Sequence, residues 1–255
     1  MRKTLTRLVD DYIGVLRDLI NTKVSKYGGS GEESFSGFLK KELKLTKEEH
    51  WSLLCASMDL MEDTNSALQN FVKFQLDGPT RYEEIGEKYL RLYGFLNAVY
   101  MQQDVIIVLH RVLNCRDNNK VKNRIHNLEI RDIRNKLGSH SMNYIDKKRA
   151  NRKSPIFVVR VDLKGSRVTY GKGSQVEFQE VDLFPLLIDH LKEIVNTLDG
   201  IVAHAVAYIW GKNKREKQRF GAILEELREE KAGNIVLKVP KGTKIVIKGY
   251  EKLSP

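Results

Sequence analysis

Hydrophobic residues recur every three or four positions over most of this chain, which is typical of amphipathic helices. The pattern predicts long helices over residues 4 to 26, 46 to 76, 81 to 113, 182 to 210 and 212 to 231. A Gly- and Ser-rich loop over residues 27 to 37 follows the first helix, and Thr46 with Glu49 forms a capping box for the second. The last helix is highly charged and has little apolar surface to bury.

A further helical pattern runs from the turn at residues 117 to 119 to Leu137, but its apolar stripe changes face part-way. The stripe begins as Val121, Ile125 and Leu128 and resumes as Ile130, Ile133 and Leu137. At about 100° per residue the second set points to nearly the opposite side of the helix. This helix is therefore either buried on two sides or broken near Asn127.

The pattern changes after residue 146. Residues 147 to 153 are basic and loop-like, and β-branched residues then predict a hairpin of strands 156 to 163 and 167 to 170. Shorter runs indicate a third strand at residues 175 to 178 and a last hairpin of 235 to 239 with 244 to 248. We therefore expect a mainly α protein with a helical bundle over residues 1 to 145. A small β-hairpin insertion and additional C-terminal helices follow over 154 to 255, packed on the bundle or extending it.

Composition supports an ordinary folded chain. Its 255 residues are 41% apolar and 30% charged, so a core can form without disulfides or structural metals. Cys55 and Cys115 are far apart in helical patterns, which favours reduced core thiols. No apolar run reaches the roughly 18 residues of a membrane span, and the first twenty residues contain three aspartates, so we expect a soluble cytoplasmic protein without a membrane partner.

Positive charge is concentrated in one quarter of the sequence. The net charge is +11, whereas residues 111 to 172 alone contain 17 Lys and Arg and 5 Asp and Glu, a net charge of +12. Such concentration suits the binding of a polyanion by counterion release, which makes RNA or DNA the natural partner. A solvated basic face with no ligand is the alternative interpretation.

The candidate chemistry lies within this basic quarter. The sequence contains no HExxH, no nucleophile elbow and no Cys or His spacing suited to zinc, so we expect neither a metal nor a cofactor. Arg134 and Asn135 instead end the apolar pattern near Leu137, and His140 follows Arg134 after five intervening residues. On a continuous helix Arg134 and His140 would point about 120° apart. A left-handed cap at Gly138 would turn the chain and return the histidine toward the arginine.

An Arg, then a polar residue, then a His after four to six intervening residues resembles the Rx4-6H motif of HEPN domains. The resemblance covers roughly residues 45 to 145 and implies a HEPN-like antiparallel bundle, here in an extended member. Many HEPN domains are metal-independent endoribonucleases that leave 2′,3′-cyclic phosphate and 5′-hydroxyl ends. The resemblance implies that His140 acts as base or acid, that Arg134 stabilises the phosphorane, and that Asn135 positions the phosphate or orients the histidine.

The same resemblance implies a homodimer, in which the second motif completes the acid and base pair, and a role as a toxin or phage-defence effector with an antitoxin or regulatory protein. We expect a set of basic residues to guide RNA to the cleft: Lys120, Lys122, Arg124, Arg131 and Lys136. Gln103 or Asp104 from the third helix is a candidate helper, although a satisfied core position is the competing interpretation for Gln103, as for His110. The main alternative function is a non-catalytic HEPN-like module that binds RNA, a nucleotide or a protein, and a third is a plain helical scaffold.

Overall fold

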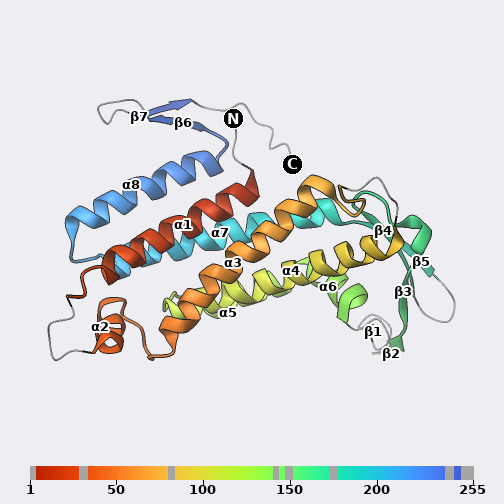
Figure 1. Cartoon of the computed structure of the whole chain (residues 1–255), viewed down its shortest axis with the longest axis horizontal. Helices are drawn as coiled ribbons and strands as arrows, with labels where there is room; N and C mark the ends of the chain where they lie inside the picture. Colours follow the sequence, from red (N-terminus) through yellow and green to blue (C-terminus); the bar gives the residue numbers. More distant parts are fainter. Residues whose placement is uncertain are drawn as a thin grey trace. The chain divides into compact units, whose positions relative to one another are not determined.

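The computed structural model describes residues 4–28, 34–79, 84–139, 144–146, 152–172, 177–238 and 244–247. Within these ranges the protein is mainly helical, as expected (Figure 1). The helices are α1 (Leu5–Val24), α2 (Phe35–Glu42), α3 (His50–Phe74), α4 (Ile85–Val112), α5 (Asn118–His126), α6 (Glu129–Arg134), α7 (Leu183–Ile209) and α8 (Lys214–Lys231). The strands are β1 (Tyr144–Asp146), β2 (Arg152–Ser154), β3 (Ile156–Val158), β4 (Arg167–Lys172), β5 (Glu177–Asp182), β6 (Ile235–Lys238) and β7 (Lys244–Ile247).

The chain divides into two compact units, each assembled from separate stretches. The first unit comprises Met1–Glu62, Val105–Val121 and Leu191–Pro255, and the second comprises Asp63–Asp104 and Lys122–His190. Both units therefore draw on residues from each side of the 145 to 154 region, which the sequence suggested as a division.

In the first unit, α8 lies along α1, and the hairpin of β6 and β7 follows α8 (Figure 1). Helix α1 begins where the Thr4 hydroxyl accepts a hydrogen bond from the backbone N–H of Arg7. Helix α8 buries Phe220, Leu224 and Leu227 at three- and four-residue steps. The expectation that this charged helix has little to bury was therefore wrong, because one apolar seam is enough to attach a helix whose other faces are solvated.

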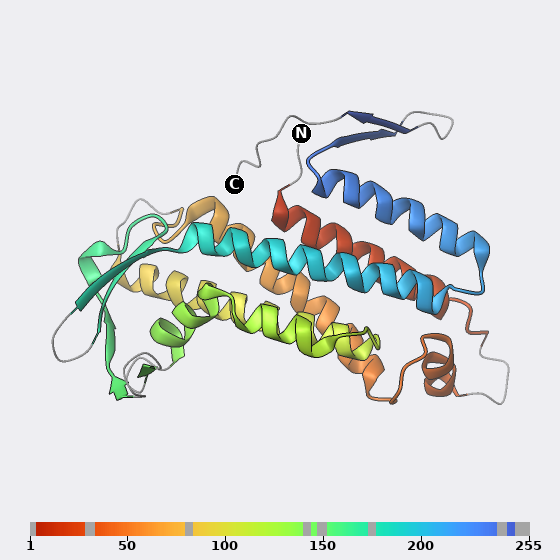
Figure 2. The same ribbon diagram turned by 180° about the vertical axis from the view of Figure 1, so that it is seen from behind.

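A polar cluster around Asp199 joins three helices of this unit. The carboxylate accepts hydrogen bonds from the Tyr12 hydroxyl of α1 at 3.1 Å and from Arg228 Nε of α8 at 2.8 Å, and Lys231 Nζ lies 3.6 Å away. Figure 2 shows α7, which contains Asp199, beside α1. Burial and the neighbouring carboxylate of Asp199 raise the pKa of Tyr12, so its hydroxyl stays protonated and remains a donor.

In the second unit, the helical pattern that ends at Leu137 is interrupted. Helix α5 ends at His126, and Asn127 and Leu128 separate it from α6. This confirms the break near Asn127 and excludes one continuous helix buried on two sides. The break lets both stripes face the interior, since Ile125 and Ile130 are each almost completely buried.

The sheet of the second unit has the order β3-β4-β5, and both pairs are antiparallel. Gly165, with φ of 59°, forms the turn before β4, and its N–H donates to the Asp77 carboxylate while its carbonyl accepts from the N–H of Leu76. Lys88 of α4 donates to the Leu163 carbonyl and pairs with Asp77 at 3.3 Å. These bonds attach the sheet to the α3–α4 connection.

Four local expectations were wrong. The strand predicted over residues 156 to 163 ends as β3 at Val158, and a short 3-10 helix, η2 (Arg160–Asp162), follows it. Helix α3 begins at His50 because residues 46 to 49 form a bend and a turn, and the Thr46 hydroxyl contacts His50 Nδ1 in place of a capping box. Helix α2, capped by the Ser34 hydroxyl, occupies part of the stretch interpreted as loop. Residues 152 and 153, also interpreted as loop, belong to β2, which pairs with β1.

Candidate functional site

The segment with the Arg-Asn motif packs antiparallel along α4, entirely within the second unit. Going forward from α6, Arg131 contacts Asp104, Arg134 contacts Tyr100, and a Cβ on Gly138 would lie 3.7 Å from the Leu96 side chain. Each step forward in the motif is thus a step backward along α4. This arrangement agrees with the helical bundle that the apolar periodicity predicted.

The Arg134 guanidinium lies over an aromatic ring and pairs with no acidic side chain among the described residues. Its guanidinium carbon is 3.7 Å from the centre of the Tyr100 ring, and Nη1 donates to Asn135 Oδ1 at 3.2 Å. Over the ranges that the structure describes, Arg134 forms no ion pair, and the nearby Asp132 pairs with Lys136 at 2.8 Å. The half-buried guanidinium therefore keeps charge and N–H donors for a ligand, and its contact with the ring helps to hold it in place.

Arg131, one turn earlier, is held by polar side chains of α4. Its side chain is only 13% exposed, and Nη1 donates to Gln103 Oε1 at 3.0 Å and to Asp104 Oδ1 at 3.3 Å. Its guanidinium also lies 4.6 Å from the Tyr100 ring centre, so one tyrosine contacts both arginines. Arg131 therefore holds α6 on α4 through a charged anchor, which fits a structural role better than contact with RNA.

A buried polar chain supports this anchor. Gln103 has no exposed surface, and its Nε2 lies 3.4 Å from His190 Nδ1, while His190 Nε2 lies 2.8 Å from Gln102 Oε1. Burial lowers the pKa of His190 to about 3, so the ring is neutral at pH 7. The hydrogen-bond pattern assigns its proton to Nε2, because Gln103 donates to Nδ1. Gln103 is thus a satisfied core residue, and of the two candidate helpers only Asp104, 44% exposed, can reach solvent.

The remaining basic residues assigned to RNA binding are dispersed. Lys136 is 15% exposed and lies between Asp132 and the Tyr170 hydroxyl. Lys122 and Arg124 are exposed on α5 in the second unit. Lys120 belongs to the first unit and pairs with Asp117 at 3.0 Å.

His140 lies outside the described residues, and the path toward it differs from the expected one. Gly138 has no positive φ; instead Asn135–Ser139 form a π-helix, η1. The left-handed cap at Gly138 was therefore a wrong prediction. A π-helical turn widens the backbone by one residue and is uncommon, and such turns occur often at functional sites.

The described side chains offer no metal site, since no group of three or more His, Cys, Asp or Glu among them is placed to bind an ion. Cys55 and Cys115 are free and half-buried. Burial raises the pKa of Cys115 to about 12, which keeps its thiol protonated and unreactive at neutral pH.

Comparisons of the chain with models of protein families, with curated proteins and with solved structures found no match. In the described part of the chain, one helix, α4, is long and apolar enough to cross a membrane, but 56% of its most apolar stretch is buried within the protein. The core helix of a water-soluble protein has the same properties.

The residues that the sequence analysis missed are tyrosines. Tyr89, Tyr93 and Tyr100 lie in the helix predicted over residues 81 to 113, and the sequence analysis gave them no role of their own. In the structure Tyr93 is 46% exposed, and the Tyr100 ring lies under the Arg134 guanidinium. Their spacing of four and seven residues places all three on one side of α4, which was the available signal.

Proposed function

We propose that this protein is a metal-independent endoribonuclease of the HEPN type. It cleaves RNA by attack of a 2′-hydroxyl and leaves 2′,3′-cyclic phosphate and 5′-hydroxyl ends. The observation that carries the proposal is the state of Arg134, whose guanidinium lies on Tyr100 beside Asn135 and has no acidic partner in the described structure. An arginine that only stabilises the fold would be expected to resemble Arg131, which is anchored by Asp104 and Gln103.

Each motif residue has a role in the proposed reaction. A base takes the proton of the 2′-hydroxyl, the 2′-oxygen forms a bond to phosphorus, and the 5′-oxygen leaves with a proton from an acid. His140 supplies the base or the acid, because imidazole changes charge near neutral pH. Arg134 donates to the phosphate oxygens as negative charge develops on them. Asn135 accepts from Arg134 through Oδ1, which leaves its amide N–H groups for the phosphate.

One histidine and one arginine provide only half of an acid and base pair. By resemblance to HEPN nucleases, the second half comes from the same motif of another copy of this chain. The proposal therefore includes a homodimer with two motifs facing one another. It also includes a role as a toxin or phage-defence effector that a regulatory protein keeps inactive.

The test is cleavage of a mixed RNA pool in excess EDTA by the wild type and by the Arg134→Ala and His140→Ala variants, with the product ends identified. Arg215→Ala is the matched control, because it removes the same charge from an exposed position on α8 in the first unit. We expect cyclic phosphate ends from the wild type and from Arg215→Ala, and a loss of about 100-fold or more in both motif variants. His140→Ala removes the acid or base, and Arg134→Ala removes a donor to the transition state.

Cleavage that is unchanged in both motif variants would refute the proposal. If the wild type does not cleave but binds RNA with strong salt dependence, the protein is a non-catalytic binding module. If it neither cleaves nor binds RNA, the result supports the third alternative, a plain helical scaffold protein.

A further inference from the structure

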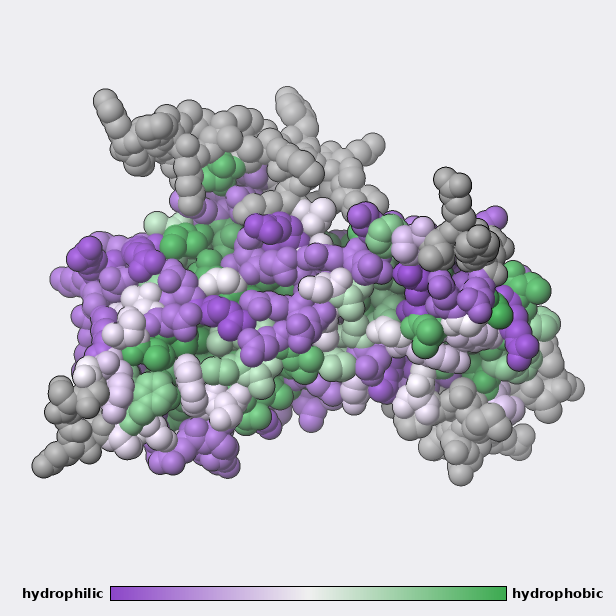
Figure 3. Space-filling model, viewed as in Figure 1, coloured by the Kyte–Doolittle hydropathy of each residue, from purple (hydrophilic) through white to green (hydrophobic). Residues whose placement is uncertain are grey.

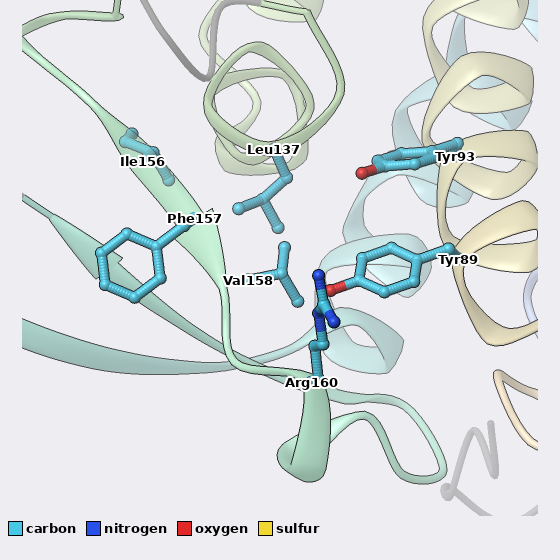
Figure 4. Close-up of a pocket in the computed structure, with 7 residues that line it drawn as sticks. All are labelled: Tyr89, Tyr93, Leu137, Ile156, Phe157, Val158 and Arg160. Atoms are coloured by element: carbon cyan, nitrogen blue, oxygen red, sulfur yellow. The ribbon is translucent and has the colours of Figure 1, made fainter. Parts of the chain in front are cut away.

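Beside the motif, α4 and β3 enclose a cleft of about 500 Å³ (Figure 4). Leu137 of η1, three residues after Arg134, forms part of its wall. Tyr89 and Tyr93 extend from α4 into the cleft, and Arg160 reaches it from the short 3-10 helix after β3 (Figure 4). All of these residues belong to the second unit. The cleft thus adjoins the residues that we assign to catalysis.

The lining combines aromatic faces, an apolar floor and one cation. The Tyr89 and Tyr93 rings have centres 5.7 Å apart and are tilted by 32°. Leu137, Ile156 and Val158 form the apolar part. In the portion of the chain that the structure describes, Arg160 is exposed and has neither an ion pair nor a hydrogen bond.

We infer that this cleft is a nucleobase-binding subsite, in which one or two unpaired bases of single-stranded RNA stack on Tyr89 and Tyr93 and Arg160 binds an adjacent phosphate. The choice of RNA as ligand rests on the proposed function. Aromatic faces bind any base through its π-surface, and a nearby cation binds the backbone. In an RNA duplex the base faces are already stacked within the helix, so the cleft selects unpaired RNA.

The spacing along α4 relates this subsite to Arg134. Tyr93 and Tyr100 are seven residues apart, so they lie on the same side of the helix about 10 Å from one another. Exposed Asn97 lies between them. Since Arg134 covers Tyr100, a phosphate on Arg134 and a base on Tyr93 are separated by about 10 Å, or roughly three stacked nucleotides at ~3.4 Å each. The subsite therefore binds bases a few nucleotides from the cleaved bond.

Charge distinguishes RNA from a peptide as the occupant. An aromatic groove also suits a proline-rich peptide, which carries no repeating charge. Here the stretch from residue 111 to 172, which includes β3 and Arg160, holds the entire positive excess of the chain. This favours a polyanion.

Three aromatic or apolar side chains are exposed around the three-stranded sheet. Figure 3 shows apolar surface over the region of the three-stranded sheet, where Phe157, Val161 and Phe178 are 45%, 89% and 63% exposed. The Phe157 and Phe178 rings meet edge to face at 6.5 Å across Gly171, and Phe157 points away from the two tyrosines (Figure 4). Phe157 therefore lines the cleft on the side away from the tyrosines, whereas Val161 and Phe178 are not among its lining residues.

Binding is tested separately from cleavage with the full-length protein and a 2′-O-methyl oligonucleotide of mixed sequence, which lacks the attacking hydroxyl. Fluorescence anisotropy gives Kd for the wild type, Tyr93→Ala, Arg160→Ala and Tyr93→Phe. Leu90→Ala is the matched control, because Leu90 is 74% exposed on α4 and does not line the cleft. We expect Kd to rise about 5- to 100-fold in Tyr93→Ala, as for loss of one base–aromatic stack, and to stay within twofold in Tyr93→Phe and Leu90→Ala.

A second variant and a comparison of single-stranded with duplex RNA test the subsite independently of Tyr93→Ala. Arg160→Ala changes an exposed residue, so it tests the subsite even if Tyr93→Ala does not fold, and it should weaken binding and reduce its salt dependence. The wild type should bind the single strand at least tenfold more tightly than a duplex of the same sequence. Equal binding of duplex and single strand, or normal binding by Arg160→Ala and Tyr93→Ala, would overturn the inference, as would Tyr93-dependent binding of a proline-rich peptide without RNA binding. If cleavage fails but Tyr93-dependent RNA binding persists, the proposed function is wrong and the subsite stands.

Discussion

The buried histidine of the second unit should make the stability of this protein depend on pH. His190 has no exposed surface and bonds only to the amides of Gln102 and Gln103 in the structure. No acidic group compensates a positive charge there, and burial lowers the pKa of His190 to about 3. In the unfolded chain the same ring has an ordinary pKa of about 6.5.

The sign and size follow from proton linkage. Because the folded pKa lies below the unfolded one, the unfolded state binds more protons as the pH falls below about 6.5. The free energy of unfolding therefore decreases from about pH 6.5 toward pH 3, and the stability from His190 is fully present only above that window. Between pH 7 and pH 5 the loss is about 2 kcal/mol for these two pKa values.

The assay is urea unfolding followed by circular dichroism at pH 7 and pH 5, for the wild type and His190→Gln, which cannot titrate. We expect the wild type to lose about 2 kcal/mol more than the variant over this interval. His204→Gln serves as a comparison, because burial lowers the pKa of His204 by a smaller amount than that of His190. This substitution should therefore remove a smaller part of the pH dependence of the unfolding free energy. If wild type and His190→Gln show the same pH dependence, the ring is not held neutral by burial and the reasoning fails.

Two further predictions concern the motif anchor and the sheet. Gln103→Leu removes one acceptor of Arg131 and leaves the buried His190 Nδ1 without its donor, so we expect a loss of about 1–3 kcal/mol in urea unfolding; unchanged stability would show that Gln103 does not anchor α6. Gly165→Ala places a side chain at φ of 59° and 3.0 Å from Gln75 Oε1, so it should cost about 1 kcal/mol or more, whereas Gly221→Ala in α8, with open space around the new Cβ, should stabilise by about 0.5–1 kcal/mol. Equal effects of the two glycine changes on the thermal midpoint would contradict this account.

Much of the fold could be predicted from local signals. Apolar periodicity predicted the long helices, and the change of stripe between Leu128 and Ile130 pointed to the interruption after His126. β-branched residues predicted the sheet. The errors lie at boundaries and in short elements such as α2, where about two turns of helix and a loop of similar composition differ by little free energy.

The sequence predicted which segment contains the candidate site, but it did not predict which side chains contact one another there. The sequence indicated Arg134 and Asn135, and it assigned Arg131 to RNA binding. It could not show that Arg131 is held by an acidic side chain whereas Arg134 is not. Asp104 and Gln103 come from a helix 27 and 28 residues earlier, and only its antiparallel packing brings them to Arg131. The π-helix at Gly138 likewise has no pattern of its own in the sequence.

By itself, then, the sequence determined the helices, the small sheet and the concentration of positive charge around the motif, because these depend on neighbours a few residues apart. Only the tertiary structure decided that Arg134 lies on Tyr100 with no acidic partner among the described residues. It alone also decided that Tyr93 and Arg160, 67 positions apart, line one cleft. The physical reason is that a guanidinium pairs with the groups that packing brings within a few ångströms, and the distance between two residues along the chain does not specify that packing.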